Sequence, residues 1–334
     1  MPQADANGIR LEYDTFGSPD ADPMLLIMGL GAQMILWDES FCEELASRGF
    51  YVIRFDNRDI GLSTRFDDAG VPDIVGMMTA SFTGAPLPEE PPYTIEDMAD
   101  DAVGLLDALG IDKAHIFGAS MGGMIAQTVA FRHPHRTKTL ISSMSSTGEA
   151  HVSQPDPEVA MVHVQPTPDD LDGYVDACVT RSKLLTGDGF PFDEAFIRAR
   201  SKRVHARGLN PAGQTRQLAA IFAQGSRRAA LETLDVPTLV MHGTADRLIP
   251  VAAGKATAEA IPNAELLLVE GMGHDSPRET WDDAFDAIVR LTQKAQEKEV
   301  TLPLSWRSAF WPRTMEVFSG WTQRASAMFS SLRQ

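Results

Sequence analysis

The feature that most constrains the fold is a regular alternation between short apolar segments and segments with a helical pattern. Each apolar segment is bounded by glycine, proline or aspartate, which is typical of a strand buried on both faces. The segments are residues 24–28, 51–55, 114–117, 139–142, 238–241 and 265–269. Because the helices between them must return the chain to the same end of the sheet, the strands are expected to pair in parallel. The alternation therefore predicts an α/β fold, preceded by a small antiparallel hairpin at residues 9–16.

The clearest helix start is Thr94-Ile95-Glu96-Asp97, a capping box in which a hydroxyl and a carboxylate accept hydrogen bonds from free backbone N–H groups. Apolar residues then recur on one face up to Leu109, and Gly110 ends the pattern. We therefore expect a helix over residues 95–109.

Two stretches interrupt the alternation. Residues 147–233 contain several helix starts but no convincing strand, and we interpret them as a helical lid inserted into a sheet domain. The two parts of that domain are residues 1–146 and 234–300. Residues 65–93 are rich in glycine and proline, yet they contain too many apolar side chains for an idle loop.

Composition excludes several classes of protein. With 29 basic and 46 acidic residues the net charge is −17, which repels nucleic acid and anionic lipid. Two cysteines, Cys42 and Cys178, cannot form a disulfide framework. The first residues have neither the basic start nor the apolar stretch of a signal peptide, and no apolar run approaches the roughly 20 residues of a membrane span. We expect a cytoplasmic protein.

A nucleophile is predicted where the strand at residues 114–117 meets Gly118-Ala119-Ser120-Met121-Gly122 and a following helix. A serine on a tight strand-to-helix turn has a strained backbone, and the residues two positions away on either side come too close for side chains. Gly118 and Gly122 relieve this crowding. The Ser120 hydroxyl then stands clear at the carboxyl end of the sheet, over the positive end of the helix.

A serine hydroxyl needs a general base, which in this chain order is expected after the nucleophile and after the acid. Among eight histidines, His242 and His274 follow Ser120 in the region where strands resume. His274 follows the last strand through a glycine-containing loop that could bring its imidazole to Ser120. His242 ends the preceding strand, and its side chain is more easily explained by local packing or bonding. We take His274 as the base.

The base in turn needs an orienting carboxylate. Asp246 lies in the loop after the strand at residues 238–241, so its loop and that of His274 leave the same end of the sheet. Taken alone, Asp246 could equally be a turn residue ahead of Pro250. Asp275 is a poorer orienter because side chains of adjacent loop residues rarely face each other. We take Asp246, ahead of Asp275, as the carboxylate that orients His274.

Several motifs together match a known family. They are Leu26-Ile27-Met28-Gly29-Leu30-Gly31, Asp56-Asn57-Arg58-Asp59-Ile60-Gly61-Leu62-Ser63, the 118–122 turn, His242-Gly243-Thr244-Ala245-Asp246 and Gly273-His274. In these motifs the chain resembles the α/β-hydrolase superfamily over essentially residues 8–295. It is most similar to the bacterial carboxylesterase and lipase branch, which includes esterases acting on polyketide-type substrates.

The resemblance implies an α/β-hydrolase fold, with a mostly parallel eight-stranded sheet, and a serine hydrolase without a cofactor. It implies Ser120, Asp246 and His274 as the catalytic triad, and an oxyanion hole formed by the backbone N–H groups of Leu30 and Met121. Such donors must point to where the carbonyl oxygen becomes negative, and losing one typically costs ~3–4 kcal/mol of barrier.

The chain departs from the family pattern at two positions. Met28 stands where histidine often precedes the first glycine, which removes a group that can brace the loop but leaves the N–H of Leu30 in place. Asp59 stands where glycine is common. A nucleotide-binding interpretation of Gly29-Leu30-Gly31 fails because Met34 occupies the third glycine position.

No metal-binding pattern is found. His133-Pro134-His135 has no carboxylate partner in view, and neither a zinc spacing nor HExxH occurs, so we expect no required metal. Apolar lid residues are expected to pack the lid against the sheet or to line an acyl pocket, two roles that the sequence does not separate. They are Met161, Cys178, Phe192, Phe196, Ile221 and Phe222.

The C-terminal tail, residues 301–334, differs from the rest of the chain. It contains three of the five tryptophans, four arginines and one acidic residue, a charge of +3. Apolar residues fall on one face at helical spacing. These are Trp311, Met315, Phe318, Ala325, Met328 and Leu332. The pattern predicts an amphipathic helix that docks on the acidic body, or that forms a homodimer or a weak lipid-surface contact.

The sequence thus favours a carboxylic ester hydrolase that forms an acyl-enzyme on Ser120, acting on a small-molecule ester with a short to medium acyl chain. The same triad could serve a lipase, a lactonase, a perhydrolase of the haloperoxidase type, an acyltransferase or a carbon–carbon bond hydrolase. A different class of function, a non-catalytic ligand-binding protein of the same fold, is disfavoured because a pure binder has no reason to keep all three triad residues.

Overall fold

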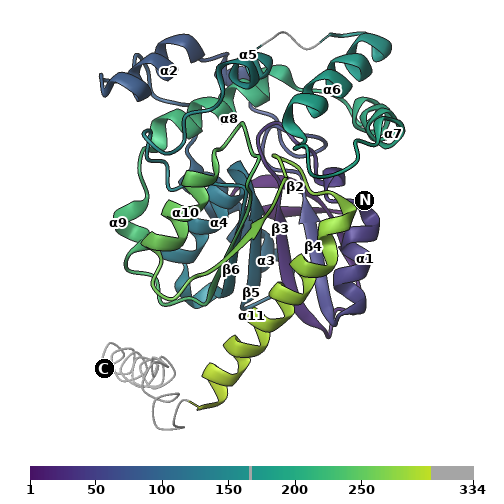
Figure 1. The fold of residues 1–334 in the computed structure, drawn as a ribbon, viewed down its shortest axis with the longest axis vertical. Helices are drawn as coiled ribbons and strands as arrows, with labels where there is room; N and C mark the ends of the chain where they lie inside the picture. The colour runs from purple at the N-terminus through teal and green to yellow at the C-terminus, as the bar shows by residue number, and fades with distance from the viewer. Residues whose placement is uncertain (165–167, 302–334) are drawn as a thin grey trace, which may run out of the picture. The chain divides into compact units, whose positions relative to one another are not determined.

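The computed structural model describes residues 1–164 and 168–301. Within these ranges eight strands form one sheet in the order β1-β2-β4-β3-β5-β6-β7-β8 (Figure 1). The strands are β1 (Gln3–Ala6), β2 (Ile9–Phe16), β3 (Asp22–Ile27), β4 (Phe50–Phe55), β5 (Ala114–Ala119), β6 (Thr137–Ser143), β7 (Thr238–Gly243) and β8 (Glu265–Val269). Strands β3 to β8 pair in parallel, whereas β1 with β2 and β2 with β4 are antiparallel. The predicted α/β fold with a mostly parallel sheet is confirmed.

The N-terminal hairpin is placed differently from the prediction. Residues 9–16 form the single strand β2, and its hairpin partner is β1, which begins at Gln3. The two strands are joined at Asn7 and Gly8, which have φ angles of 49° and 79°. Two successive positive φ values are typical of the tight turns that join hairpin strands. The prediction missed β1 because its polar sequence, QADA, has no apolar alternation.

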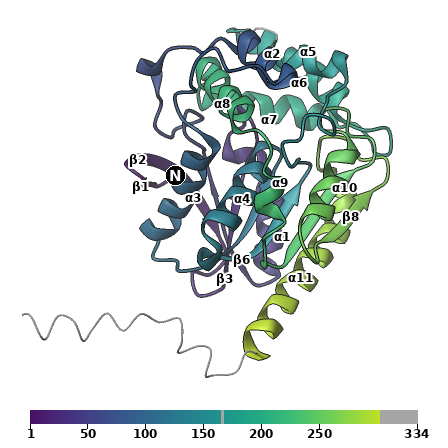
Figure 2. The same cartoon turned by 90° about the vertical axis from the view of Figure 1, so that its left-hand side faces the viewer.

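Helices cover both faces of the sheet (Figures 1 and 2). They are α1 (Glu39–Ser47), α2 (Ile74–Thr83), α3 (Ile95–Ala108), α4 (Met121–Arg132), α5 (Pro157–Val164), α6 (Leu171–Leu185), α7 (Glu194–Ala206), α8 (Pro211–Gln224), α9 (Arg228–Leu231), α10 (Val251–Ala260) and α11 (Trp281–Thr301). Short 3₁₀ turns lie at Met34–Leu36, Asp67–Ala69, Pro134–Arg136 and Arg278–Thr280.

The two faces of the sheet have separate cores because successive strand residues point to opposite sides. In β3, Leu25 and Ile27 pack with α3, α4 and α10, whereas Met24 and Leu26 pack with α1 and the first turns of α11. This two-sided burial explains why the strands are apolar throughout. The predicted capping box is present, because the side chains of Thr94 and Asp97 each accept a hydrogen bond from the other's backbone N–H and start α3.

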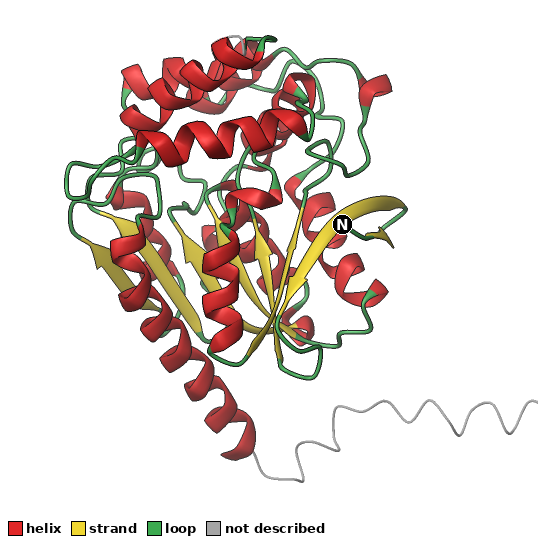
Figure 3. Ribbon diagram, turned by 90° about the vertical axis from the view of Figure 1, so that its right-hand side faces the viewer, coloured by secondary structure: helices red, strands yellow, loops and turns green. Residues whose placement is uncertain are grey.

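Five helices, α5 to α9, lie between β6 and β7, and no strand occurs among the described residues of this stretch. We call α5, α6, α7 and α8 the cap helices. They gather above one end of the sheet (Figures 1 and 3). The apolar 65–93 segment contains α2, which packs against α8, and its Met77 side chain is fully buried.

A buried ion pair joins cap helix α8 to the core. Asp59 has a φ of 71°, which explains why glycine is common at this position. Its carboxylate accepts hydrogen bonds from Arg216 at 2.7 and 2.8 Å and from the Tyr93 hydroxyl at 2.8 Å. Burial would raise the pKa of Asp59, but the hydrogen bonds from Arg216, Phe66 and Tyr93 outweigh it and lower the pKa. The second departure from the family pattern is therefore an anchor for the cap.

The chain divides into a compact unit of residues 1–292 and a second unit of residues 293–334. Within the described part, no helix has both the length and the apolar character needed to cross a membrane. The predicted amphipathic tail, residues 301–334, lies outside the described residues apart from Thr301. Its proposed dimer or lipid contact therefore stays a prediction.

We expect Arg216→Met to lower the free energy of unfolding by about 3–5 kcal/mol, because it leaves the Asp59 carboxylate buried without its ion partner. Urea unfolding at pH 7 measures the loss. Arg228→Met is the matched control, since Arg228 also pairs with two carboxylates but at the surface, and little change is expected there. Equal losses for the two variants would show that burial does not set the strength of the Asp59 pair.

Candidate active site

The turn between β5 and α4 holds Ser120 in a strained backbone conformation. Its φ of 57° and ψ of −122° are unusual for a residue with a side chain. A Cβ on Gly118 would overlap the carbonyl oxygen of Gly122, and a Cβ on Gly122 would overlap that of Ile27. The Ser120 N–H donates to the Ser143 carbonyl at 2.9 Å, which fixes the turn to β6. Only glycine fits at positions 118 and 122, two residues before and after Ser120, as the crowding argument requires.

Among the three residues predicted as a triad, His274 lies within hydrogen-bond distance of both Ser120 and Asp246. His274 Nε2 is 3.0 Å from Ser120 Oγ, and His274 Nδ1 is 2.7 Å from Asp246 Oδ2. Ser120 follows β5, Asp246 follows β7 and His274 follows β8, so the carboxyl ends of three parallel strands supply the three side chains. This arrangement can activate the serine hydroxyl, because the imidazole accepts its proton while the carboxylate orients the ring.

Asp246 is held as a carboxylate. Its Oδ1 accepts hydrogen bonds from the backbone N–H groups of Leu248 and Ile249, both at 2.9 Å. Burial would raise the pKa of Asp246, but attraction to His274 and hydrogen bonds from His242 and His274 outweigh it and hold the pKa well below its usual range. An ionised Asp246 stabilises the imidazolium form of its histidine partner.

The alternative residues take other positions. His242 is fully buried, and its Nε2 donates to the Ile249 carbonyl at 2.8 Å, so it is bonded locally as expected. Asp275 forms no hydrogen bond with His274 in the described part of the chain. Burial raises its pKa, and its Oδ1 is buried without a hydrogen-bond partner. Neither residue takes the place of its predicted counterpart.

The loop after β3, residues 28–34, lies directly against Ser120. A Cβ on Gly29 would be 3.1 Å from the Ser120 Cβ, a closer contact than most side chains make, so the loop and Ser120 are tightly packed here. The predicted oxyanion donors belong to this contact region. Leu30 follows Gly29 in the loop, and Met121 is the first residue of α4, where N–H groups have no partner within the helix.

Three side chains hold the 28–34 loop in place without a histidine at position 28. Asn57 Nδ2 donates to the Met28 carbonyl at 2.9 Å, and Asp56 accepts from the Met34 N–H at 2.7 Å. Gln217 of α8 is fully buried and connects two core loops. Its Oε1 accepts from the Gly31 N–H, and its Nε2 donates to the Arg58 carbonyl, both at 2.9 Å. These contacts replace the brace that Met28 does not supply.

Sequence reasoning missed Gln217. It lies 186 positions from Gly31 in a helix that carries no motif, so no local signal identifies it. Asn57 lies in the motif at residues 56–63, but its contact with the 28–34 loop was not predicted. Among the lid residues, Met161 is 60% exposed and so does not pack against the sheet. Ile221 packs against the core that includes β3 and α4.

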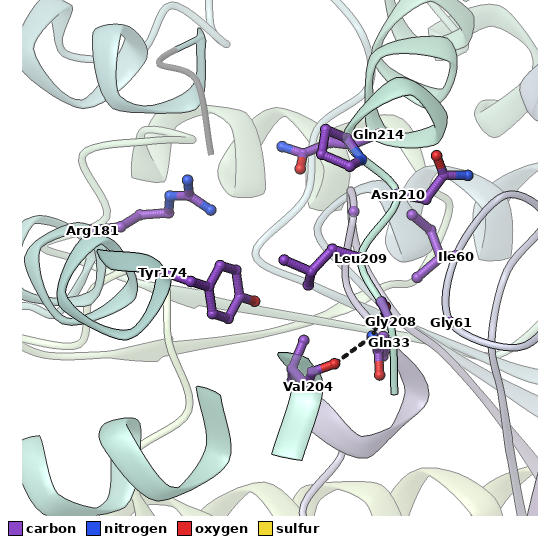
Figure 4. A pocket seen from close by; sticks show the side chains of 12 residues that line it. Gln33, Ile60, Gly61, Tyr174, Arg181, Val204, Gly208, Leu209, Asn210 and Gln214 are labelled. Atoms are coloured by element: carbon purple, nitrogen blue, oxygen red, sulfur yellow. Dashed lines mark hydrogen bonds between the residues drawn. The ribbon is translucent and has the colours of Figure 1, made fainter. Parts of the chain in front are cut away.

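A cavity lies between the 28–34 loop and the cap helices (Figure 4). Its volume is about 440 Å³ with its opening to solvent included. Its walls come from the loop, from residues 60–61, from helices α6, α7 and α8 and from the α7–α8 connection. Gln33 joins two of these walls, because its Nε2 donates to the carbonyl of Val204 at 3.0 Å and of Gly208 at 2.8 Å. No group of three or more potential metal ligands occurs among the described residues.

Comparisons with known proteins agree with the fold. The chain belongs to the α/β hydrolase fold family, which it matches over residues 22–277. Rhodomycin D methylesterase DauP of Streptomyces sp. strain C5 is 29% identical over 86% of this chain and 96% of its own length. A 2-hydroxymuconate semialdehyde hydrolase of Pseudomonas putida is 29% identical over 61% of this chain and 69% of its own. The enol-lactonase of Burkholderia xenovorans LB400 has the same fold, with a TM-score of 0.65 at 24% identity over 87% of this chain and 100% of its own. The chain is therefore a hydrolase of this family.

The lowered pKa of Asp246 predicts how its contribution to stability depends on pH. Its folded pKa lies below the unfolded value of 3.8, so the stabilisation is complete above that value and is lost as the pH falls further. We expect Asp246→Asn to be less stable than the wild type at pH 7, with a difference that shrinks below about pH 4. Urea unfolding from pH 7 to pH 3 measures this, and Asp172→Asn at an exposed site is the control. A difference that does not change with pH would contradict the argument.

Proposed function

We propose that this protein is a carboxylic ester hydrolase that acts through Ser120, His274 and Asp246. The observation that carries the proposal is the pair of short distances from one imidazole, 3.0 Å to the Ser120 hydroxyl and 2.7 Å to the Asp246 carboxylate. The strained turn and the methylesterase relative support it.

The reaction follows from this geometry. Ser120 Oγ attacks the ester carbonyl while His274 Nε2 takes its proton, and Asp246 stabilises the imidazolium that forms. The imidazolium then donates its proton to the leaving alcohol, which leaves an acyl group on Ser120. Water attacks this acyl-enzyme with His274 as base, releases the carboxylic acid and restores the serine. No cofactor is needed for any of these steps.

The oxyanion of each tetrahedral intermediate is proposed to bind the N–H groups of Leu30 and Met121. The positive end of the α4 dipole adds to the same stabilisation. Because the donor of Leu30 belongs to the 28–34 loop, its direction depends on how that loop is held. Gln217 and Asn57 are proposed to hold it, which makes them positioning residues.

The cap helices are proposed to act as the lid that shapes the substrate site. The backbone N–H of His274 donates to the Leu185 carbonyl at the end of α6 at 2.7 Å, so the cap reaches the catalytic histidine. A covered site next to Ser120 suits small esters of short to medium acyl chain better than an emulsified lipid.

A fluorophosphonate probe is expected to label the wild-type protein and to leave Ser120→Ala unlabelled, since only an activated serine attacks the phosphorus. His274→Ala should lose at least 10³-fold in kcat/KM on p-nitrophenyl butyrate, by analogy with triad removals. A series from acetyl to palmitoyl esters then tests the acyl length, with a maximum expected at or below about eight carbons. Labelling that survives Ser120→Ala would exclude this mechanism.

Gln217→Met is expected to lower kcat about 10- to 100-fold with a smaller effect on KM. A displaced loop misplaces the Leu30 N–H, and this donor is used only when the carbonyl oxygen becomes negative in the transition state. Gln224→Met is the control. Gln224 lies on the same helix and its amide also bonds the core, at Thr128 Oγ1, but it does not contact the 28–34 loop. Affinity for a trifluoromethyl ketone, whose adduct carries the oxyanion, should fall with kcat in Gln217→Met alone. Equal kinetic losses in both variants would indicate a general effect of loosening α8.

A further inference from the structure

We propose that the cavity beside the 28–34 loop binds a carboxylate group of the substrate, and that Arg181 is the residue that recognises it. This inference rests on the proposed ester hydrolysis, because the carboxylate belongs to the same molecule as the ester attacked by Ser120. The substrate class is then a small ester that carries a free acid.

The charge of the cavity wall is the first argument. Arg181 of α6 is the only charged residue among the described residues that line the cavity, and no acidic residue lines it. The chain as a whole has 46 acidic residues against 29 basic ones, and two other arginines near the cavity are paired, Arg207 with Asp56 and Arg216 with Asp59. Arg181 forms no ion pair with a described residue. A guanidinium in this acidic protein thus faces the cavity without a counter-ion among the described residues.

Hydrogen bonding gives a second argument, independent of charge. The Arg181 Nε is buried and has no hydrogen-bond partner among the described residues. A buried donor without a partner typically lowers the stability of the folded protein by about 1–3 kcal/mol, and a bound acceptor would remove this penalty. The Gln214 side chain also makes no hydrogen bond to a described residue. The other lining amides are occupied, because Asn210 bonds Asp59 and Gly213, and Gln33 bonds the cap backbone. The unused donors of the wall therefore belong to Arg181 and Gln214.

The two side chains face the same space. Figure 4 shows the Arg181 guanidinium and the Gln214 amide extending toward each other from opposite walls, with the Tyr174 ring between α6 and the loop. A guanidinium presents a planar fork of N–H donors that matches the two oxygens of a carboxylate. The single positive charge of Arg181 neutralises a carboxylate, but it leaves one of the two negative charges of a phosphate monoester unbalanced. The wall chemistry fits a carboxylate better than a neutral acyl chain or a cation.

The position of the cavity relative to Ser120 suggests a length for the test substrates. Gly31 lines the cavity and Gly29 contacts Ser120. Two residues of chain span at most about 7 Å, which is the length of about five or six covalent bonds, since three bonds join consecutive Cα atoms 3.8 Å apart. We therefore choose test substrates whose acid lies about five bonds from the ester carbonyl, as in a half ester of adipic acid, because this length spans from Ser120 to the Gly31 side of the cavity.

The test compares two p-nitrophenyl esters of the same length at pH 7.5, the monoester of adipic acid and the hexanoate, which lacks the acid. The measured quantity is the ratio of kcat/KM for the acidic ester to that for the neutral ester. We expect Arg181→Met to lower this ratio 10- to 100-fold, mainly through KM, and Arg181→Lys to restore part of it. Arg203→Met removes the same charge from cap helix α7, outside the cavity, and should leave the ratio unchanged.

A second pair of esters places the acid on the alcohol side, the butyrate of 5-hydroxypentanoic acid and pentyl butyrate, followed by proton release. Dependence on Arg181 in either pair supports the carboxylate site and tells which end of the substrate occupies the cavity. The proposal is overturned if Arg181→Met changes neither ratio, or if Arg203→Met lowers the ratio as much, which would indicate the general field of the protein rather than a site.

Binding separates this inference from the proposed hydrolysis. Ser120→Ala cannot turn over, so calorimetry can measure its affinity for monomethyl adipate, with dimethyl adipate as the neutral counterpart. We expect the added Arg181→Met change to weaken binding of the monoester at least 10-fold more than that of the diester. Equal weakening refutes the carboxylate site. If instead the wild type hydrolyses no ester and Ser120 is not labelled, the proposed function fails while this binding result still decides whether Arg181 holds a carboxylate.

Discussion

The contact between two backbones, at Gly122 and Ile27, is the constraint on which the site depends. It brings the turn after β5 so close to the end of β3 that no side chain fits between them. The same approach places Gly29 against Ser120 and so sets the Ser120 side chain beside the 28–34 loop. The strain at Ser120 persists because the surroundings hold it from both sides, with β5 buried in the sheet and the Ser120 N–H bonded to β6.

The cap is part of this arrangement rather than a separate cover. Two consecutive residues of α8 make different contacts with the core. Arg216 forms a buried ion pair with Asp59, and Gln217 accepts a hydrogen bond from the Gly31 N–H. The ion pair fixes the helix, and the fixed helix presents the amide that holds the loop. Both departures from the family pattern are explained together in this way. Asp59 supplies the anchor for α8, and α8 supplies a brace that Met28 cannot provide.

How much could be predicted from the sequence depended on how local the signal was. The strands of the parallel sheet and the positions of Ser120, Asp246 and His274 follow from short motifs whose neighbours in sequence determine their geometry. The hairpin strand β1 was missed because an edge strand can be polar. Gln217 and Arg181 could not have been singled out, because an amide or a guanidinium on a helix acquires its role from residues far away in sequence. Met161 was wrongly expected to pack against the sheet or line a pocket, since apolar character alone does not tell which side chain faces solvent.

The charge of the protein bears on what such a site can select. A net charge of −17 repels an acidic substrate at long range, yet solvent ions screen that repulsion beyond roughly 10 Å. No described residue lining the cavity is acidic, and the Arg181 guanidinium there has no ion pair with a described residue. It acts at short range and in a lower dielectric, where its attraction is much stronger. The local field can then oppose the global one. An acidic surface would disfavour acidic molecules in general, while the cavity would favour the few whose ester and acid are spaced to reach Ser120 and Arg181 at once.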